Sequence, residues 1–190
     1  MPERTINPGQ FGARGIRGSD AVARRLDDLA GGIATPVTVK RGLMARLNYL
    51  TRTPHARAAA KAAGLAVTDR TLNAWLKGKR RPNRASLEKI ERAYLTVRRQ
   101  NVAQHLLKRL NSGGGTRVEI HPLNQSQVAR PHQRVVEYRQ MNVRRWDSIV
   151  RAWAAGDEQG LDDAWTGDVL PDLGSQWGQY EMVTNVGFAA

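Results

Sequence analysis

The sequence predicts a mainly α-helical N-terminal domain followed by a small α+β domain whose elements run β-β-α-α-β. Apolar residues recur every three to four positions between residues 19 and 111, which is typical of helices packed around one core. Ser112-Gly113-Gly114-Gly115 breaks this pattern, and the segments beyond it alternate apolar and polar residues as strands do. The predicted division is a flexible basic arm (1–18), a helical domain (19–111), a glycine linker (112–115) and an α+β domain (116–190).

Two helices are expected before residue 52. Residues 1–18 combine proline, glycine and scattered arginine without hydrophobic periodicity, which indicates an arm without regular structure. Ser19 has the position of a helix cap, and Gly31 and Gly32 end the helix that it starts. A second helix is expected over residues 39–50, where apolar residues fall at helical spacing, namely Leu43, Met44, Leu47 and Leu50.

A pair of short helices is predicted over residues 54–79. Thr53 offers a capping hydroxyl, Pro54 suits the first helical position, and Gly64 ends this alanine-rich helix. Thr68 or Asp69 caps the next helix, whose inner side carries Leu72, Trp75 and Leu76 and which ends at Gly78. The spacing from Gly64 to Leu72 is about two residues longer than in a common helix-turn-helix, so a longer turn is expected.

A long helix and the α+β domain follow. Ser86 is expected to cap the long helix, which continues to residue 111. Residues 116–121, 133–139 and 180–188 alternate apolar and polar residues and are the three expected strands. Asn142 is expected to cap the first of two intervening helices, and three tryptophans on the apolar faces of these helices are expected in the core: Trp146, Trp153 and Trp165.

The formal net charge of +13 is distributed unevenly along the chain. Residues 40–109 hold eighteen Lys or Arg residues against three acids, which gives this stretch a net charge of +15. Residues 146–190 hold one Arg against eight acids, a net charge of −7. A cationic stretch of this density binds polyanions by releasing their counterions, so the middle of the chain is expected to bind nucleic acid.

The short helix pair lies inside the basic stretch and has the composition of a major-groove reader. Its second helix combines an apolar inner side with an outer side that carries hydrogen-bonding residues. Arg suits guanine and Asn suits adenine in the major groove, while the cations after the helix are placed to bind phosphates. The predicted DNA-binding residues are Arg70, Thr71, Asn73, Lys77, Lys79, Arg80, Arg81 and Arg84.

Other chemistries lack support in the sequence. The four histidines do not have metal-ligand spacing, and the absence of cysteine excludes thiolate metal sites and disulfides. Gly113-Gly114-Gly115-Thr116 lacks the Lys-Ser/Thr of a phosphate-binding loop. No catalytic constellation can be assembled, so we predict no enzyme activity, no cofactor and no metal. The composition also predicts a cytoplasmic, nucleoid-associated protein without a membrane partner.

The chain resembles the terminal proteins that cap linear chromosomes and plasmids of Streptomyces-type actinomycetes. The resemblance begins at Lys40 to Leu50 and continues through Ala59 to Gly64 and Arg70 to Leu76, to the basic segment Gly78 to Pro82 that ends the helix. The order of elements in the second domain is also similar. It implies a protein that binds telomeric DNA and offers a hydroxyl as primer for end replication. The implied partners are double-stranded or telomeric DNA, a telomere-recruiting protein and a DNA polymerase.

Such priming requires a hydroxyl near the DNA-binding unit, and the resemblance makes Thr116 the first candidate for covalent attachment to DNA and Ser112 the second. An ordinary threonine at the start of a strand is the alternative interpretation of Thr116. For the whole chain, the alternative is a transcriptional regulator with a helix-turn-helix, whose C-terminal domain forms a homodimer or senses a ligand.

Overall fold

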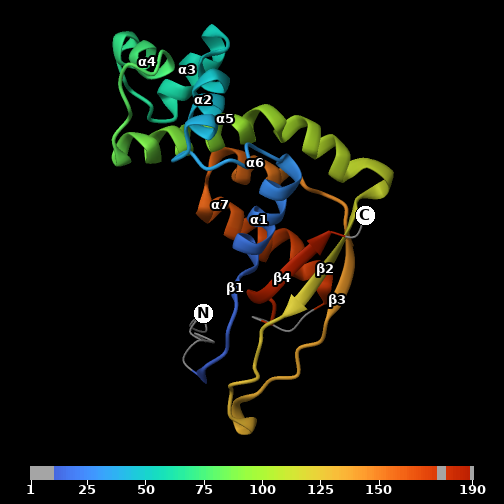
Figure 1. Ribbon diagram of the computed structural model, residues 1–190. Helices are drawn as coiled ribbons and strands as arrows, with labels where there is room; N and C mark the ends of the chain where they lie inside the picture. The colour runs from blue at the N-terminus through green and yellow to red at the C-terminus, as the bar shows by residue number, and fades with distance from the viewer. Residues whose placement is uncertain (1–10, 175–178, 189–190) are drawn as a thin grey trace. The chain divides into compact units, whose positions relative to one another are not determined.

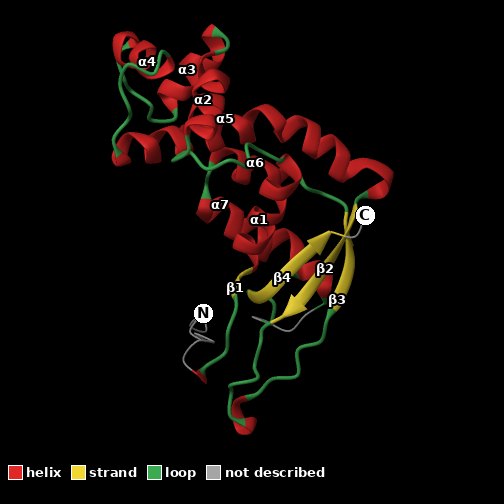
Figure 2. Cartoon of the chain, viewed as in Figure 1, coloured by secondary structure: helices red, strands yellow, loops and turns green. Residues whose placement is uncertain are grey.

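The computed structural model describes residues 11–174 and 179–188 (Figure 1). Within these residues the chain is mainly helical and has one small antiparallel sheet of four strands, which confirms a mixed α+β fold (Figure 2). The helices are α1 (Gly18–Ala30), α2 (Lys40–Thr51), α3 (Pro54–Ala62), α4 (Asp69–Leu76), α5 (Arg84–Asn111), α6 (Asp147–Ala155) and α7 (Glu158–Ala164). The strands are β1 (Ile16–Arg17), β2 (Thr116–Pro122), β3 (Arg139–Val143) and β4 (Met182–Phe188).

The chain divides into two compact units, and the division differs from the expected one. Unit 1 comprises Met1–Leu29 and His105–Ala190, and unit 2 comprises Ala30–Gln104. The boundary therefore lies inside α5 and not at the glycine run, where Ser112–Gly114 form a single 3-10 turn. α1 belongs to unit 1 because its side chains bond there: the Asp27 carboxylate accepts the Trp153 indole N–H at 3.0 Å, and the Ser19 hydroxyl donates to Asp162 at 2.8 Å.

The sheet of unit 1 has the strand order β1-β4-β2-β3, with every neighbouring pair antiparallel. The core of unit 1 includes Trp146, Trp153 and Trp165, as expected, and each is about 1% exposed. Each indole N–H also has an acceptor, since Trp146 donates to the Val143 carbonyl and Trp165 to the Tyr180 carbonyl, both at 3.0 Å. The three tryptophans are therefore structural residues.

The segment expected as a flexible arm contributes to this sheet. Residues 1–10 lie outside the described part, but Arg14 bridges to Asn124, and β1 pairs with β4 through Ile16 and Val183. Gly15 makes this approach possible, because a Cβ there would lie 2.7 Å from the Val183 carbonyl oxygen. The glycine that suggested a flexible arm thus permits close backbone contact.

The prediction of a second strand over residues 133–139 is wrong, since β3 begins at Arg139. Before that point the Gln125 side chain takes the place of a neighbouring strand, accepting from the Arg134 N–H at 2.7 Å and donating to the Arg134 carbonyl at 2.9 Å. Val135 is 87% exposed as a result. Asn142 lies within β3, where its side chain donates to the Gly114 carbonyl, so it does not cap α6.

Unit 2 is organised around one buried arginine, Arg46 of α2, which is 5% exposed. Its guanidinium donates to the carbonyls of Thr35, Gly42 and Ile33 at 2.7, 3.2 and 3.1 Å. Its Nε lies 2.6 Å from the carboxylate of Glu91 in α5. The guanidinium carbon also lies 5.1 Å from the centre of the Tyr94 ring. One side chain therefore joins the segment before α2, α2 itself and α5.

We expect Glu91→Ala to destabilise unit 2 by about 3 kcal/mol, because loss of its partner leaves the Arg46 charge buried and uncompensated. Glu88→Ala removes the exposed partner of Arg84 on the same helix and should cost less than about 1 kcal/mol. Urea denaturation of the two variants measures the difference. Equal midpoints would show that the Arg46–Glu91 pair does not hold the unit together.

Candidate nucleic-acid interface

The sequence signals that predicted α3 correspond to contacts in the structure. Thr53 is the N-cap, and its hydroxyl oxygen accepts the Ala56 N–H at 3.1 Å, while Pro54 occupies the first helical position. Ala60 faces inward and is buried, and Ala59 and Ala63 are partly buried against the same core. Because these side chains are small, α3 lies close to its neighbours.

The helix α4 is fixed at both ends and anchored along one side. Thr68 caps it by accepting the Thr71 N–H at 3.2 Å, and Gly78 follows it with a φ of +66°. Leu72 and Trp75 are each 5% exposed and belong to the core of unit 2. This confirms the expected inner side of the helix, with Leu76 partly buried at its edge.

The turn between α3 and α4 comprises residues 63–68, and its length has a structural cause. Leu65 is 6% exposed and lies in the core, and its N–H donates to the Ala60 carbonyl at 3.0 Å. Val67 packs partly against the same core. The additional residues therefore carry an apolar anchor, which the sequence pattern did not identify.

The outer side of α4 is polar and exposed. The side chains of Arg70, Asn73 and Lys77 are exposed on the helix whose opposite side is buried, so the structure brings these three predicted residues together. Thr71 differs from them, since it is half-buried and its hydroxyl lies 2.9 Å from the Thr68 hydroxyl. Thr71 therefore supports the start of the helix and is a weaker candidate for contact with a ligand.

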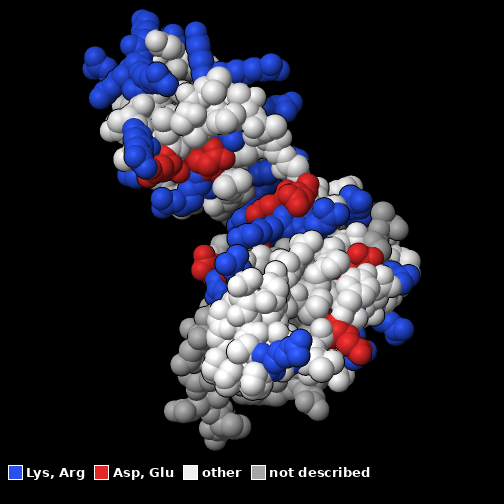
Figure 3. Space-filling view, turned by 60° about the horizontal axis from the view of Figure 1, so that its bottom comes forward, with Lys and Arg blue, Asp and Glu red and all other residues white. Residues whose placement is uncertain are grey.

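The cations that follow α4 fall into two groups. Lys79 and Arg80 are exposed and form no ion pair within the described residues. Arg81 donates to the Thr38 carbonyl at 3.1 Å, and Arg84 pairs with Glu88 at 3.2 Å. Figure 3 shows Lys and Arg side chains gathered at the upper end of the view. This surface can bind an extended anion.

Some arginines of the basic stretch are not available to a ligand. Arg46 is buried, and Arg98 is half-buried with its guanidinium donating to the Ala30 carbonyl at 2.7 Å. The net charge of +15 therefore overstates the positive charge that unit 2 offers at its surface.

The two hydroxyls considered for covalent attachment lie on either side of the turn after α5. Ser112 is exposed and donates to the Arg109 carbonyl at 2.7 Å. Thr116 is half-buried at the start of β2 and donates to the Leu110 carbonyl at 2.8 Å. Both hydroxyls are thus engaged with the end of α5, and Ser112 is the more accessible.

The described residues contain neither a metal-binding cluster nor a membrane-spanning helix. Across residues 11–174 and 179–188, no group of three or more His, Asp or Glu side chains converges as a metal site would require. In the same part of the chain, no helix has both the length and the apolar character needed to cross a membrane.

No protein-family model matches this chain, and no curated protein and no solved structure is significantly similar to it. The resemblance to terminal proteins therefore remains a prediction based on the residues quoted above.

We expect Trp75→Ala to destabilise unit 2 by about 3–5 kcal/mol, since it removes a large buried side chain. Trp75→Phe is the matched control. Among the described residues the indole N–H of Trp75 has no hydrogen-bond partner, so phenylalanine loses packing volume but no hydrogen bond and should cost much less. Thermal melts of both variants distinguish them, and an unchanged melt of Trp75→Ala would contradict the assigned core.

Proposed function

We propose that the chain is a DNA-binding protein in which α3 and α4 act as a helix-turn-helix. The observation that carries the proposal is the two-sided character of α4. Leu72 and Trp75 anchor its inner side in the core, while Arg70 and Asn73 are exposed on its outer side. A helix held in this way can enter the major groove without loss of packing.

Two kinds of contact would act together in this complex. Arg70 and Asn73 can form paired hydrogen bonds with base edges and so discriminate sequence, with Lys77 beside them. Lys79 and Arg80 would bind phosphates, which fixes the register of the helix and supplies affinity through release of counterions. Arg81 would contribute less, since its guanidinium already donates to the Thr38 carbonyl in the free protein. The pair of Arg84 with Glu88 is exposed and weak, so Arg84 can still bind a phosphate.

The finer proposal is that this DNA-binding unit belongs to a protein that primes replication at the ends of linear DNA. The resemblance of residues 40–82 to terminal proteins supports it, and so does the location of two hydroxyls on either side of the turn after α5. In the priming step, the hydroxyl oxygen bonds to the α-phosphorus of a deoxynucleoside triphosphate. Pyrophosphate leaves, and the hydroxyl proton passes to a base. A DNA polymerase would catalyse the step.

The second candidate function is transcriptional regulation, and the contact of Thr116 favours it. The Thr116 hydroxyl donates to the Leu110 carbonyl, and its backbone pairs with Val143 in the sheet. This is the environment of a threonine that secures a strand. A regulator would use the α+β unit for assembly as a homodimer or for a ligand.

We expect Arg70→Ala and Asn73→Ala to weaken binding at particular base pairs by about 1–3 kcal/mol. Lys79→Ala and Arg80→Ala should each weaken binding to all sequences alike. Each should also reduce the slope of the logarithm of the binding constant against the logarithm of salt concentration by about one. Binding to a randomised duplex library at several salt concentrations measures both effects. If Arg70→Ala and Asn73→Ala left the sequence preference unchanged, α4 would not be the reading helix.

The priming proposal predicts that the chain becomes labelled when it is incubated with a radioactive deoxynucleotide, a DNA polymerase and a telomeric template. Thr116→Val keeps the shape of the side chain but removes the hydroxyl, and Ser112→Ala tests the second candidate. Loss of label in one variant, with normal labelling of Thr116→Ser, identifies the attachment site. Undiminished label in the double variant would exclude both residues.

A further inference from the structure

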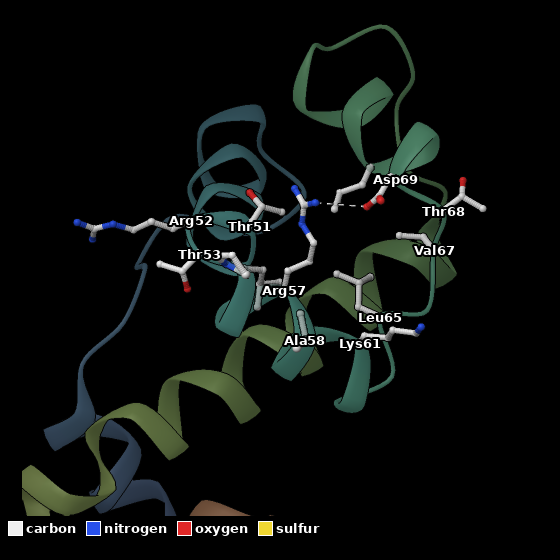
Figure 4. Close-up of a pocket in the computed structure, with 14 residues that line it drawn as sticks. Thr51, Arg52, Thr53, Arg57, Ala58, Lys61, Leu65, Val67, Thr68 and Asp69 are labelled. Atoms are coloured by element: carbon white, nitrogen blue, oxygen red, sulfur yellow. Dashed lines mark ion pairs between the residues drawn. The ribbon is translucent and has the colours of Figure 1, made fainter.

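The long turn between α3 and α4 borders a hollow in unit 2 of about 620 Å³ (Figure 4). Leu50, Ala60, Leu65 and Leu72 line it and are all buried, so its inner part is apolar. Its polar lining comes from the end of α2, from α3 and from the first residue of α4. Known ligand sites have volumes of about 300–1,000 Å³, so the hollow is large enough for part of a nucleotide.

An ion pair joins the two helices at this hollow. Nη1 of Arg57 in α3 lies 3.5 Å from Oδ1 of Asp69 in α4, and the two side chains are 49% and 75% exposed. In Figure 4 the Arg57 side chain extends from α3 towards Asp69. Arg52 and Lys61 also line the hollow, but their side chains point away from Arg57. Arg57 is thus the cation directed at the hollow.

Asp69 lies in the first turn of α4, where an acid favours the helix dipole and also lies close to Arg70. The basic stretch from residue 40 to residue 109 contains three acids, and each lies within ion-pair distance of an arginine. Glu88 and Glu91 lie on α5, whereas Asp69 is the first residue of α4 and immediately precedes Arg70. Its negative charge nevertheless repels any phosphate that a DNA duplex would bring to the start of the helix.

We propose that the exposed rim of the hollow between α3 and α4 binds a phosphate group of nucleic acid, with Arg57 as the direct contact and Asp69 as its competitor in the free protein. The proposal deepens the DNA-binding function above and rests on it. In the complex, a phosphate replaces the Asp69 carboxylate on the Arg57 guanidinium. Asp69 then turns to solvent, to which most of its side chain is already exposed.

The exchange is favourable because the two partners of Arg57 bind it with different strength. An exposed carboxylate–guanidinium pair contributes little, since water screens the charges and two flexible side chains must be held in place. A phosphate presents several oxygens to the planar guanidinium and is fixed in place by the rest of the duplex. The ion pair therefore keeps Arg57 directed at the hollow in the free protein. When DNA binds, Asp69 releases the Arg57 guanidinium to the phosphate.

The first test compares two arginines that line the same hollow. We expect Arg57→Ala to weaken binding of a duplex about fivefold or more and to lower the salt slope by about 0.9, the value for one lost phosphate contact. Arg52→Ala removes the same charge from a side chain that points away, so its effect should be clearly smaller in both measures. Equal effects of the two variants would overturn the site.

The second test asks whether Asp69 acts through Arg57. Asp69→Asn should tighten duplex binding about threefold at low salt, beyond the gain from Glu88→Gln measured in an Arg84→Ala background, where an equal charge on α5 is removed without freeing Arg84. The gain should vanish when Arg57→Ala is also present. If Asp69→Asn raised the affinity no more than Glu88→Gln does, the change in net charge would explain the effect. The same holds if the rise in affinity persisted in the Arg57→Ala background. Either result would disprove competition between Asp69 and the phosphate for Arg57. Thermal melts confirm that the variants are folded.

Two sources of the phosphate are distinguished by the DNA used. A covalently closed circle offers only internal phosphodiesters, whereas a linear duplex can carry 5′-phosphate or 5′-hydroxyl ends. An effect of Arg57→Ala on every DNA assigns the hollow to the backbone, and an effect confined to 5′-phosphorylated linear DNA assigns it to the terminus. If the unchanged protein bound no DNA, the proposed function would fail. If it bound DNA and depended on Lys79 but not on Arg57, only the hollow would be misassigned.

Discussion

The structure of unit 2 depends on the burial of one charge. Arg46 is surrounded by carbonyl oxygens from the segment before α2, by the Glu91 carboxylate and by the Tyr94 ring. Removing a guanidinium from water is costly unless its donors are satisfied, so these partners must be held together for the unit to fold. Gly42 is part of the same arrangement, because a Cβ there would lie 2.2 Å from the Pro36 carbonyl oxygen. The close approach of that segment to α2 thus requires a glycine.

The same core positions α3 and α4. Leu47 and Leu50 of α2 pack in one cluster with Leu65, Leu72 and Trp75. The orientation of the outer side of α4 is therefore set by side chains of α2 and of the turn between α3 and α4. A helix of eight residues has little stability of its own, so its polar side can be presented to a ligand only because the apolar side is fixed in this way.

The elements that depend on local signals were predictable from the sequence, and those that depend on distant partners were not. Thr53, Pro54 and Thr68 act within a few residues of their own position, so α3 and α4 lie where the pattern placed them. The start of β3 is decided by Gln125, which binds the backbone of Arg134, and the pairing of β1 is decided by β4. No periodicity in residues 133–139 or 14–17 carries that information. The Arg57–Asp69 pair left only a faint signal, a lone acid between residue 40 and Glu88.

The basic stretch separates into two sets of cations with different physical roles. Arg46, Arg81 and Arg98 donate to backbone carbonyls of unit 2, a use that suits a planar guanidinium with several donors. Lys77, Lys79 and Arg80 remain exposed at and just after the end of α4. Other cations of the stretch are exposed as well, among them Lys40, Arg52 and Lys89. The fold therefore uses a few arginines to hold the segments of unit 2 together and leaves most of the other cations at the surface, three of them beside the helix proposed to read bases.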